Sequence, residues 1–428
     1  MIRRSTPLAV TAATAALALA VTGCGGGDTP ESSATDKPTG NATLWVRDSQ
    51  KGFINLLTDQ YNKTHDGKIQ VTVIPAASFV QKFGTAAQTG SGPDIASIDL
   101  VYLPFFASKG VLDDLTEVQN QLTWKDALSP AHRKLAEYEG KVYALPFTAE
   151  ASMIFYNKDL FTKAGLDPSK PPTTFDEMLN AARKIHALGK DYYGFTMAGQ
   201  CGGCNVFEVA PHIWASKGDI LSEDGKTAQF TSPEVTDVLT FYRQMWTEGL
   251  MPPNAKTDNG SIQGTTFQGG KTGMVTLGAF YVQTLMADKK VDFGVTPIMG
   301  KDGGTASFAG GDEIAVTKSA KNKAVAYDFV KWATSEEAQT ILAKNSIVPV
   351  RTDLIDKIYA PIDPRYKPLG EAMSTGQTPY SVVENGIIND NNGPWATLIN
   401  QGVFGAGDIR QAQETANKAA QAIIDKGA

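Results

Sequence analysis

The spacing of apolar residues in the first hundred positions alternates between that of strands and that of helices. Residues 43–46 form a short run typical of a buried strand, and apolar residues within 53–61 then recur at helical spacing. Residues 69–73 alternate as a second strand, so a β-α-β unit opens this part of the chain. A helix over residues 78–88 and a strand over residues 92–99 follow. This alternation predicts an α/β fold with a mostly parallel sheet, covered by helices on both faces.

The ends of these predicted strands carry polar and aromatic side chains. The first strand ends between Trp45 and Asp48, and the third ends at Asp99. In open α/β sheets, ligands bind in the crevice outside the carboxyl ends of the strands. We therefore expect these positions to lie close to a ligand.

Further helices are expected in the rest of the chain. A strand is predicted over residues 153–158. Helices are predicted over residues 174–188, 233–248, 322–333 and 409–424. Thr174 and Glu177 have the spacing of a capping box at the start of the first of these helices. Large side chains on the apolar stripes of the helices are expected in the core rather than in a ligand site. They are Tyr242, Met245, Trp246, Phe329 and Trp332.

The first residues have the pattern of an export signal. Arg3 and Arg4 precede an uncharged, Ala-rich stretch over residues 7–21, which is too short to span a bilayer. The stretch ends in Val-Thr-Gly-Cys and resembles a bacterial lipobox, in which Cys24 would carry the lipid. The alternative is an ordinary secretory signal in which Cys24 is incidental. We expect residues 1–23 to be the signal peptide of an exported protein held at the outer face of the cytoplasmic membrane.

Composition and charge narrow the remaining possibilities. Residues 24–40 consist almost entirely of Gly, Ser, Thr, Pro and charged residues, which predicts a flexible tether. The rest is long enough for two domains. With 39 basic and 45 acidic residues the net charge is −6, so neither nucleic acid nor an anionic membrane surface is an expected partner. The four histidines are far apart in the sequence, which disfavours a histidine metal site, and no metal or cofactor is expected.

The remaining two cysteines, Cys201 and Cys204, are separated by two glycines. Outside the cytoplasm such a close pair is expected to oxidise to a local disulfide, and the glycines permit the tight turn. So short a loop gains only about 2 kcal/mol of entropic stabilisation, so the disulfide is expected to shape a loop rather than to hold the fold. A zinc site, which would need two more ligands, and a thioredoxin-like redox site are the alternatives.

Two motifs carry a resemblance to a known family. Residues 154–166, IFYNKDLFTKAGL, and residues 172–177, PTTFDE, resemble the family 1 extracellular solute-binding proteins, the relatives of maltose-binding protein. The resemblance runs from about Ala42 to the C-terminus. It is supported in order by residues 92–95, 109–115, 269–275 and 315–323 and by Trp395. It implies the type II fold of periplasmic binding proteins, with two Rossmann-like lobes and a ligand cleft between them.

The resemblance also implies how the lobes are built. The N-terminal lobe would comprise residues 41–149 and 313–349, and the C-terminal lobe residues 150–312 and 350–428. The hinge crossings would lie at residues 148–151, 310–313 and 348–351. Ligand contacts on both lobes would stabilise a closed form that the permease subunits of an ABC importer can read. The protein is expected to act as a monomer and to bind a carbohydrate.

Sugar recognition needs charge-assisted hydrogen bonds to hydroxyl groups and flat rings against the apolar sugar face. Phe280 stands where relatives place a stacking tryptophan, and Trp395 matches a second stacking position. The disulfide loop is a departure from the family pattern beside Asn205. The ligand contacts that the resemblance implies are Trp45, Arg47, Asp48, Lys51, Asp99, Glu150, Asn205, Phe207, Phe280, Tyr281, Asp312 and Trp395.

Two other functions remain as alternatives. Asp99 and Glu150 could form the carboxylate pair of a glycosidase, but no nucleophile elbow, zinc-protease motif or phosphate-binding loop supports an enzyme. The same fold could instead bind a polyamine, iron or a glycerol phosphate. Iron would need a tyrosine cluster and a phosphate would need several cations, so a neutral polyol fits best and a polyamine second.

Overall fold

The computed structural model describes residues 37–359 and 361–427. The predicted signal peptide, Cys24 and all but the last residues of the predicted tether lie outside the described residues. Within the described part of the chain, every helix is too short or too polar to cross a membrane.

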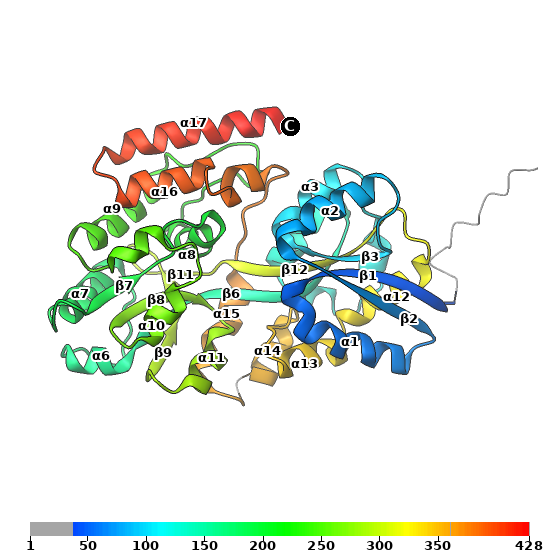
Figure 1. Ribbon diagram of the computed structural model, residues 1–428, viewed down its shortest axis with the longest axis horizontal. Coiled ribbons are helices and arrows are strands. Elements are labelled where there is room, and N and C mark those ends of the chain that lie inside the picture. The colour runs from blue at the N-terminus through cyan, green and yellow to red at the C-terminus, as the bar shows by residue number, and fades with distance from the viewer. Residues whose placement is uncertain (1–36, 360, 428) are drawn as a thin grey trace, which may run out of the picture.

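The first lobe follows the expected β-α-β order. Its elements are β1 (Gly40–Arg47), α1 (Lys51–Thr64), β2 (Gly67–Ile74), α2 (Ala76–Gln88), β3 (Ile95–Asp99), α3 (Leu103–Ser108), α4 (Thr116–Asn120), α5 (Pro130–Leu135), β4 (Glu137–Tyr138) and β5 (Lys141–Val142). β6 (Leu145–Asn157) then leads into the second lobe (Figure 1).

The second lobe contains most of the remaining elements. They are α6 (Lys158–Lys163), α7 (Phe175–His186), β7 (Tyr193–Thr196), α8 (Gly202–Ala215), α9 (Pro233–Thr247), α10 (Gln263–Gln268), β8 (Thr272–Gly278), α11 (Tyr281–Asp288), β9 (Phe293–Thr296), β10 (Ile298–Met299) and β11 (Thr305–Ala306). β12 (Ala309–Val316) returns the chain to the first lobe. The last elements are α12 (Lys323–Ala333), α13 (Glu336–Lys344), α14 (Thr352–Tyr359), α15 (Lys367–Thr375), α16 (Pro394–Phe404) and α17 (Ile409–Gly427).

One sheet runs through both lobes, in the order β2-β1-β3-β12-β6-β8-β7, with β9 also paired to β6. β1 is parallel to β2 and β3, and β7 is parallel to β8. β12 is antiparallel to β3 and β6, and β6 is antiparallel to β8 and β9. The α/β fold with two lobes is confirmed, but the expectation of a mostly parallel sheet is wrong. The cause is that β6 and β12 are shared between the lobes and cross them in opposite directions (Figure 1).

β6 changes partners in the middle of its length. Leu145 to Ala151 pair with β12, whereas Ser152 to Tyr156 pair with β8. This change lies at the predicted first crossing. At the predicted third crossing, Val348 pairs with Ala149. After α14 the chain reaches the second lobe again. There the Arg365 guanidinium lies over the Phe293 ring of β9, 4.2 Å from the ring centre. The exact lobe limits stay a prediction.

Two apolar clusters form the core. The first includes Leu44 and Phe147 and extends to Leu277 of β8. The second lies in the C-terminal lobe around Tyr242 and Trp395. Val101 of the first lobe packs against this second cluster, so the two lobes touch.

Local sequence determines where α7 begins. The Thr174 side chain accepts a hydrogen bond from Glu177 N at 3.3 Å, as the capping pattern predicts. The Glu177 carboxylate accepts from Thr173 N at 2.8 Å instead of from Thr174 N. The N-terminus of α7 is therefore capped, but Glu177 bonds back to Thr173 rather than to the N-cap residue Thr174.

Candidate ligand-binding site

A partly buried ion-pair cluster joins three adjacent strands at the junction of the lobes. Arg47 ends β1, Asp99 ends β3 and Asp312 lies on β12, and the strand order places these three side by side. Arg47 Nη1 donates to Asp99 Oδ2 at 2.8 Å, and Nη2 donates to Asp312 Oδ1 at 2.5 Å. Burial alone would lower the pKa of Arg47, but the two carboxylates outweigh it and raise the pKa. Arg47 is therefore a fixed cation at the base of the site.

Glu150 lies on β6 beside this cluster and lacks a partner for one oxygen. Burial, reinforced by the charges of Asp99 and Asp312, raises the pKa of Glu150 to about 8. Its Oε1 is buried without a hydrogen-bond partner, although the residue as a whole keeps part of its surface open to solvent. Such a carboxyl group can bond to a ligand that supplies the missing partner.

The Glu150 carboxylate lies directly against Gly278, the last residue of β8. A β-carbon added to Gly278 would overlap Glu150 Oε1 and lie 2.7 Å from the Phe280 ring. Phe280 is 47% exposed, and its ring centre lies 4.8 Å from that of the half-buried Tyr281. Burial raises the pKa of Tyr281, with smaller contributions from Asp258 and Glu150. An exposed aromatic ring and an unpaired carboxylate oxygen thus both lie on the side of Gly278 where a β-carbon would be.

The structure adds two residues that the sequence did not single out. Glu384, 2% exposed, accepts from Asn389 Nδ2 at 2.8 Å through Oε2, and its Oε1 has no partner. Burial and the charge of Asp99 raise its pKa. Burial together with Asp99 and Glu384 raises the pKa of Tyr102 to about 12, against the opposing effect of Arg47. The charges of Asp99 on the first lobe and Glu384 on the second thus act on the same tyrosine, Tyr102.

Sequence offered a weak signal for both residues. Glu384 is a single carboxylate between Val383 and the apolar pair Ile387 and Ile388, where a charged side chain is unusual. Tyr102 follows Asp99 by three residues, at the expected carboxyl end of the strand.

Three predicted residues of the first lobe are not part of the ion-pair cluster. Asp48 is exposed and accepts from Ala76 N at 3.1 Å, and Lys51 is exposed in the first turn of α1. Trp45 is half-buried and packs against the first apolar cluster. These contacts are structural, and a ligand role for the three residues stays a prediction.

Three predicted residues of the second lobe pack against other parts of that lobe, Asn205 and Trp395 fully buried and Phe207 half-buried. Asn205 is fully buried, and its Nδ2 donates to Gly199 O at 3.4 Å. Phe207 packs against Phe308, with ring centres 5.5 Å apart. Trp395 has no exposed surface and contacts Phe230 at 5.6 Å between ring centres.

The position of Trp395 follows from helical spacing. Leu398 and Ile399, three and four residues further on, are also buried, so Trp395 lies on the apolar stripe of α16. The structure gives this ring no face for a stacking ligand, which differs from the expectation that the resemblance raised.

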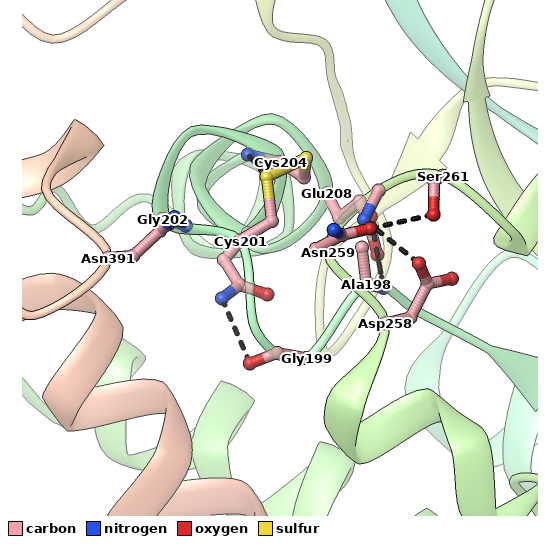
Figure 2. The surroundings of a disulfide bond; sticks show 12 residues. Ala198, Gly199, Cys201, Gly202, Cys204, Glu208, Asp258, Asn259, Ser261 and Asn391 are labelled. Atoms are coloured by element: carbon pink, nitrogen blue, oxygen red, sulfur yellow. Dashed lines mark hydrogen bonds between the residues drawn. A yellow bond between two sulfur atoms is a disulfide. The ribbon is translucent and has the colours of Figure 1, made fainter.

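The predicted disulfide between Cys201 and Cys204 is present, at the start of α8 (Figure 2). Cys201 is the N-cap of the helix, and its sulfur accepts from Cys204 N at 3.1 Å.

A separate cavity of about 1110 Å³ also lies between the lobes, and none of the predicted residues lines it. Its walls carry charged side chains such as Lys109, Lys134 and Glu223 together with Tyr138 and Tyr380. Among the described residues, no buried polar atom without a partner belongs to its lining, whereas Glu150 and Glu384 each have one. The cluster around Glu150 is therefore the stronger candidate site.

Comparisons with known proteins agree with this architecture. The profile described as bacterial extracellular solute-binding protein matches residues 46–340. The diacetylchitobiose binding protein DasA of Streptomyces coelicolor is 25% identical over 423 residues, covering 94% of this chain and 96% of that protein.

Solved structures show the same fold. The cyclic α-maltosyl-1,6-maltose binding protein of Arthrobacter globiformis is 25% identical with a TM-score of 0.77, covering 91% of this chain and 100% of that one. The sugar-binding protein MalE of Xanthomonas citri is 19% identical with a TM-score of 0.79, covering 90% and 98%.

Proposed function

The chain belongs to the bacterial extracellular solute-binding proteins, and we propose that it binds a mono- or oligosaccharide between its lobes and delivers it to an ABC importer. The observation that carries the choice of ligand is the arrangement around Gly278. There the unpaired Glu150 oxygen and the exposed Phe280 ring lie next to each other. A sugar has hydroxyl groups at its edge and an apolar face, so one sugar ring can bond to the Glu150 oxygen and stack on the Phe280 ring at the same time.

Both lobes contribute polar groups to this proposed site. Asp99 and Tyr102 come from the first lobe, Glu384 comes from the second, and Glu150 lies on the shared strand β6. A ligand that bonds to groups on both lobes stabilises the closed form relative to the open form. Closure is what the importer subunits would recognise, and it needs no catalytic step. Incubation with oligosaccharides should therefore release no new reducing ends.

Thermal-shift and calorimetric titrations test the proposal. The panel is maltotriose, N,N′-diacetylchitobiose, mannitol and spermidine. A ligand at 100 times its Kd stabilises the folded state by about 2.7 kcal/mol, which is easily detected. Phe280→Ala should weaken saccharide binding about tenfold, because the stacking face is lost. Phe105→Ala is the matched control, since Phe105 is an exposed phenylalanine on α3. Absence of any saccharide effect across a wider sugar panel would refute the assignment.

A polyamine is the second candidate, favoured by the charge balance of the site. The carboxyl groups of Asp99, Glu150, Asp312 and Glu384 surround one cation within the ion-pair cluster, Arg47. A cationic solute would favour the charged forms of Glu150 and Glu384, whose pKa values are raised in its absence. A thermal shift with spermidine and with none of the sugars would favour it.

Lipid anchoring through Cys24 is part of the same proposal. It rests on the lipobox-like sequence after residues 7–21. Cys24→Ala should move the protein from the membrane fraction to the soluble extracellular fraction. An unchanged distribution would favour an ordinary secretory signal.

A further inference from the structure

The Cys201–Cys204 turn is packed between two other segments of the second lobe (Figure 2). On one side Gly260, with φ +92°, lies so close that an added β-carbon would be 2.5 Å from Cys204 Sγ. On the other side Gly202 N donates to Asn391 Oδ1 at 2.9 Å. A β-carbon at Gly202 would overlap Ile388 O. The turn therefore fits against this segment only with no side chain at Gly202.

Each neighbouring segment continues into the proposed ligand site. The segment that includes Asn391 and Ile388 also contains Asn389, whose side chain donates to Glu384 at 2.8 Å. A β-carbon at Gly203 would lie 2.7 Å from Asn389 Oδ1, so the turn directly abuts this asparagine. The position of the Glu384 carboxylate is thus coupled to the disulfide turn through one side chain.

The second segment leads to Tyr281. Asp258 is buried and accepts from Gly260 N at 2.9 Å, and further along the same segment a β-carbon at Gly264 would overlap the Tyr281 hydroxyl. Gln200, next to the disulfide, donates its backbone N–H to Asp258 O at 2.8 Å. The disulfide turn therefore contacts the supports of both Glu384 and Tyr281.

We propose that the Cys201–Cys204 disulfide is a positioning element of the ligand site, and that its reduction converts the protein to a form with lower ligand affinity. The inference rests on the proposed function of this site. Two free thiol sulfurs cannot approach as closely as two bonded sulfurs, so reduction changes the shape of the turn. Gly260 lies against Cys204 Sγ, and Gly202 N is bonded to Asn391 Oδ1, so this change is passed to one neighbouring segment or both. The fold as a whole is little affected, because the disulfide closes a very short loop.

The chemical step is thiol–disulfide exchange with an external dithiol. A thiolate of the dithiol attacks one cysteine sulfur, the S–S bond breaks and a mixed disulfide forms. The second thiolate of the dithiol resolves it. Two electrons and two protons pass to Cys201 and Cys204, and the dithiol leaves as its own disulfide. Both cysteines are half-buried rather than enclosed, so a small reductant has access.

The first test compares oxidised and dithiothreitol-reduced protein. Reduction should weaken maltotriose or N,N′-diacetylchitobiose binding about tenfold, the loss of roughly one charge-assisted hydrogen bond, with little change in melting temperature. The variant Cys201→Ser/Cys204→Ser should bind like the reduced protein and should not respond to dithiothreitol. Equal affinity of the oxidised and reduced forms would overturn the inference and leave the proposed function intact.

A second measurement does not need a ligand. Hydrogen exchange of the reduced protein should be faster at residues 202–205, 258–262 and 385–391 and unchanged in α7. Unchanged exchange at residues 385–391 would overturn the inference even if no saccharide binds.

Two glycine variants separate the sulfur contact from backbone strain. Gly260→Ala in the oxidised protein should weaken binding because its β-carbon meets Cys204 Sγ. Gly270→Ala carries a similar positive φ of +74° with nothing within 4 Å, so it should keep wild-type affinity. Equal effects of the two variants would contradict a role for the sulfur contact.

Discussion

At the scale of single residues, the candidate site depends on groups whose chemistry is visible in sequence and on neighbours whose importance is not. Asp99 could be named because it ends a predicted strand. Glu150 could be named because the family resemblance implies it as a ligand contact. Glu384 had only a weak signal, because its role depends on its burial and on the charge of Asp99, which is far away in the sequence. Trp395 was named from the resemblance, but its helical spacing with Leu398 and Ile399 already indicated the core.

Gly278→Ala tests the contact between Glu150 and Phe280. The added β-carbon would overlap Glu150 Oε1 and crowd the Phe280 ring, so both side chains must move. We expect saccharide affinity to fall at least tenfold, measured by calorimetry, because Glu150 and Phe280 can no longer contact the edge and the face of the same sugar ring. Gly52→Ala in α1 is the control, since nothing lies within 4 Å of its β-carbon position. Wild-type affinity in Gly278→Ala would argue against this location of the site.

Glu150→Gln tests the raised pKa of the carboxyl group. The folded-state pKa of about 8 lies above the ordinary value of 4.5, so the folded protein binds more protons than the unfolded chain between these pH values. The free energy of unfolding of the wild type should therefore fall as pH rises from about 4.5 to 8. The substitution should flatten this part of the curve, as followed by denaturant titration at several pH values. Parallel curves for both proteins would contradict the raised pKa.

At the scale of elements, local pattern predicted helices well and strand direction poorly. The strands and helices of the β-α-β opening and the cap of α7 follow from short-range spacing and side-chain hydrogen bonds. The antiparallel direction of β6 and β12 within each lobe depends on where the chain crosses between the lobes, and no local sequence signal encodes that.

Buried His132 is hydrogen-bonded to one of these crossing strands, β6. Its Nε2 lies 3.1 Å from Thr148 O, which can only accept. Nε2 therefore carries the proton, and Nδ1 accepts from Ser129 Oγ at 2.8 Å.

His132→Phe should destabilise the protein by about 1–3 kcal/mol, because the buried Thr148 carbonyl loses its donor. Burial lowers the pKa of His132 to about 4 from 6.5, although hydrogen bonds to Thr148 and Gly310 act in the opposite direction. Its neutral form therefore contributes stability that is complete above pH 6.5 and is lost as pH falls toward 4.

His132→Phe should also reduce the loss of stability as the pH falls from 6.5 toward 4. His65→Phe is the control, because Phe can keep the stacking of His65 on Tyr61 at 4.2 Å between ring centres. Thermal unfolding at pH 5 and pH 7 provides the comparison, and equal stability of the wild type and the His132 variant would show that this contact is dispensable.

At the scale of the whole molecule, the lobes are joined by a shared sheet and also touch through side chains. Gly311 on β12 has φ +129°, and an added β-carbon would overlap Thr148 O of β6, so the two crossing strands lie very close here. The resemblance predicted two lobes and crossings of this kind. It did not predict that Val101 packs against the apolar cluster of the opposite lobe, since such a contact depends on the relative position of the lobes.

Val101→Lys should shift the lobes toward an open arrangement. The charged side chain cannot remain against the apolar cluster of the second lobe without a large desolvation cost, so the contact between the lobes is weakened. A saccharide that bridges the lobes must then supply the free energy for closure, and its apparent affinity is the intrinsic affinity multiplied by the fraction of ligand-free molecules that are closed. Val73→Lys is the matched control, because Val73 is an exposed valine on β2 of the first lobe. Small-angle scattering should report a larger radius of gyration for ligand-free Val101→Lys alone, with both variants unfolding at similar temperatures. If Val101→Lys bound sugar like the wild type and kept the same radius, the contact would have no part in closure.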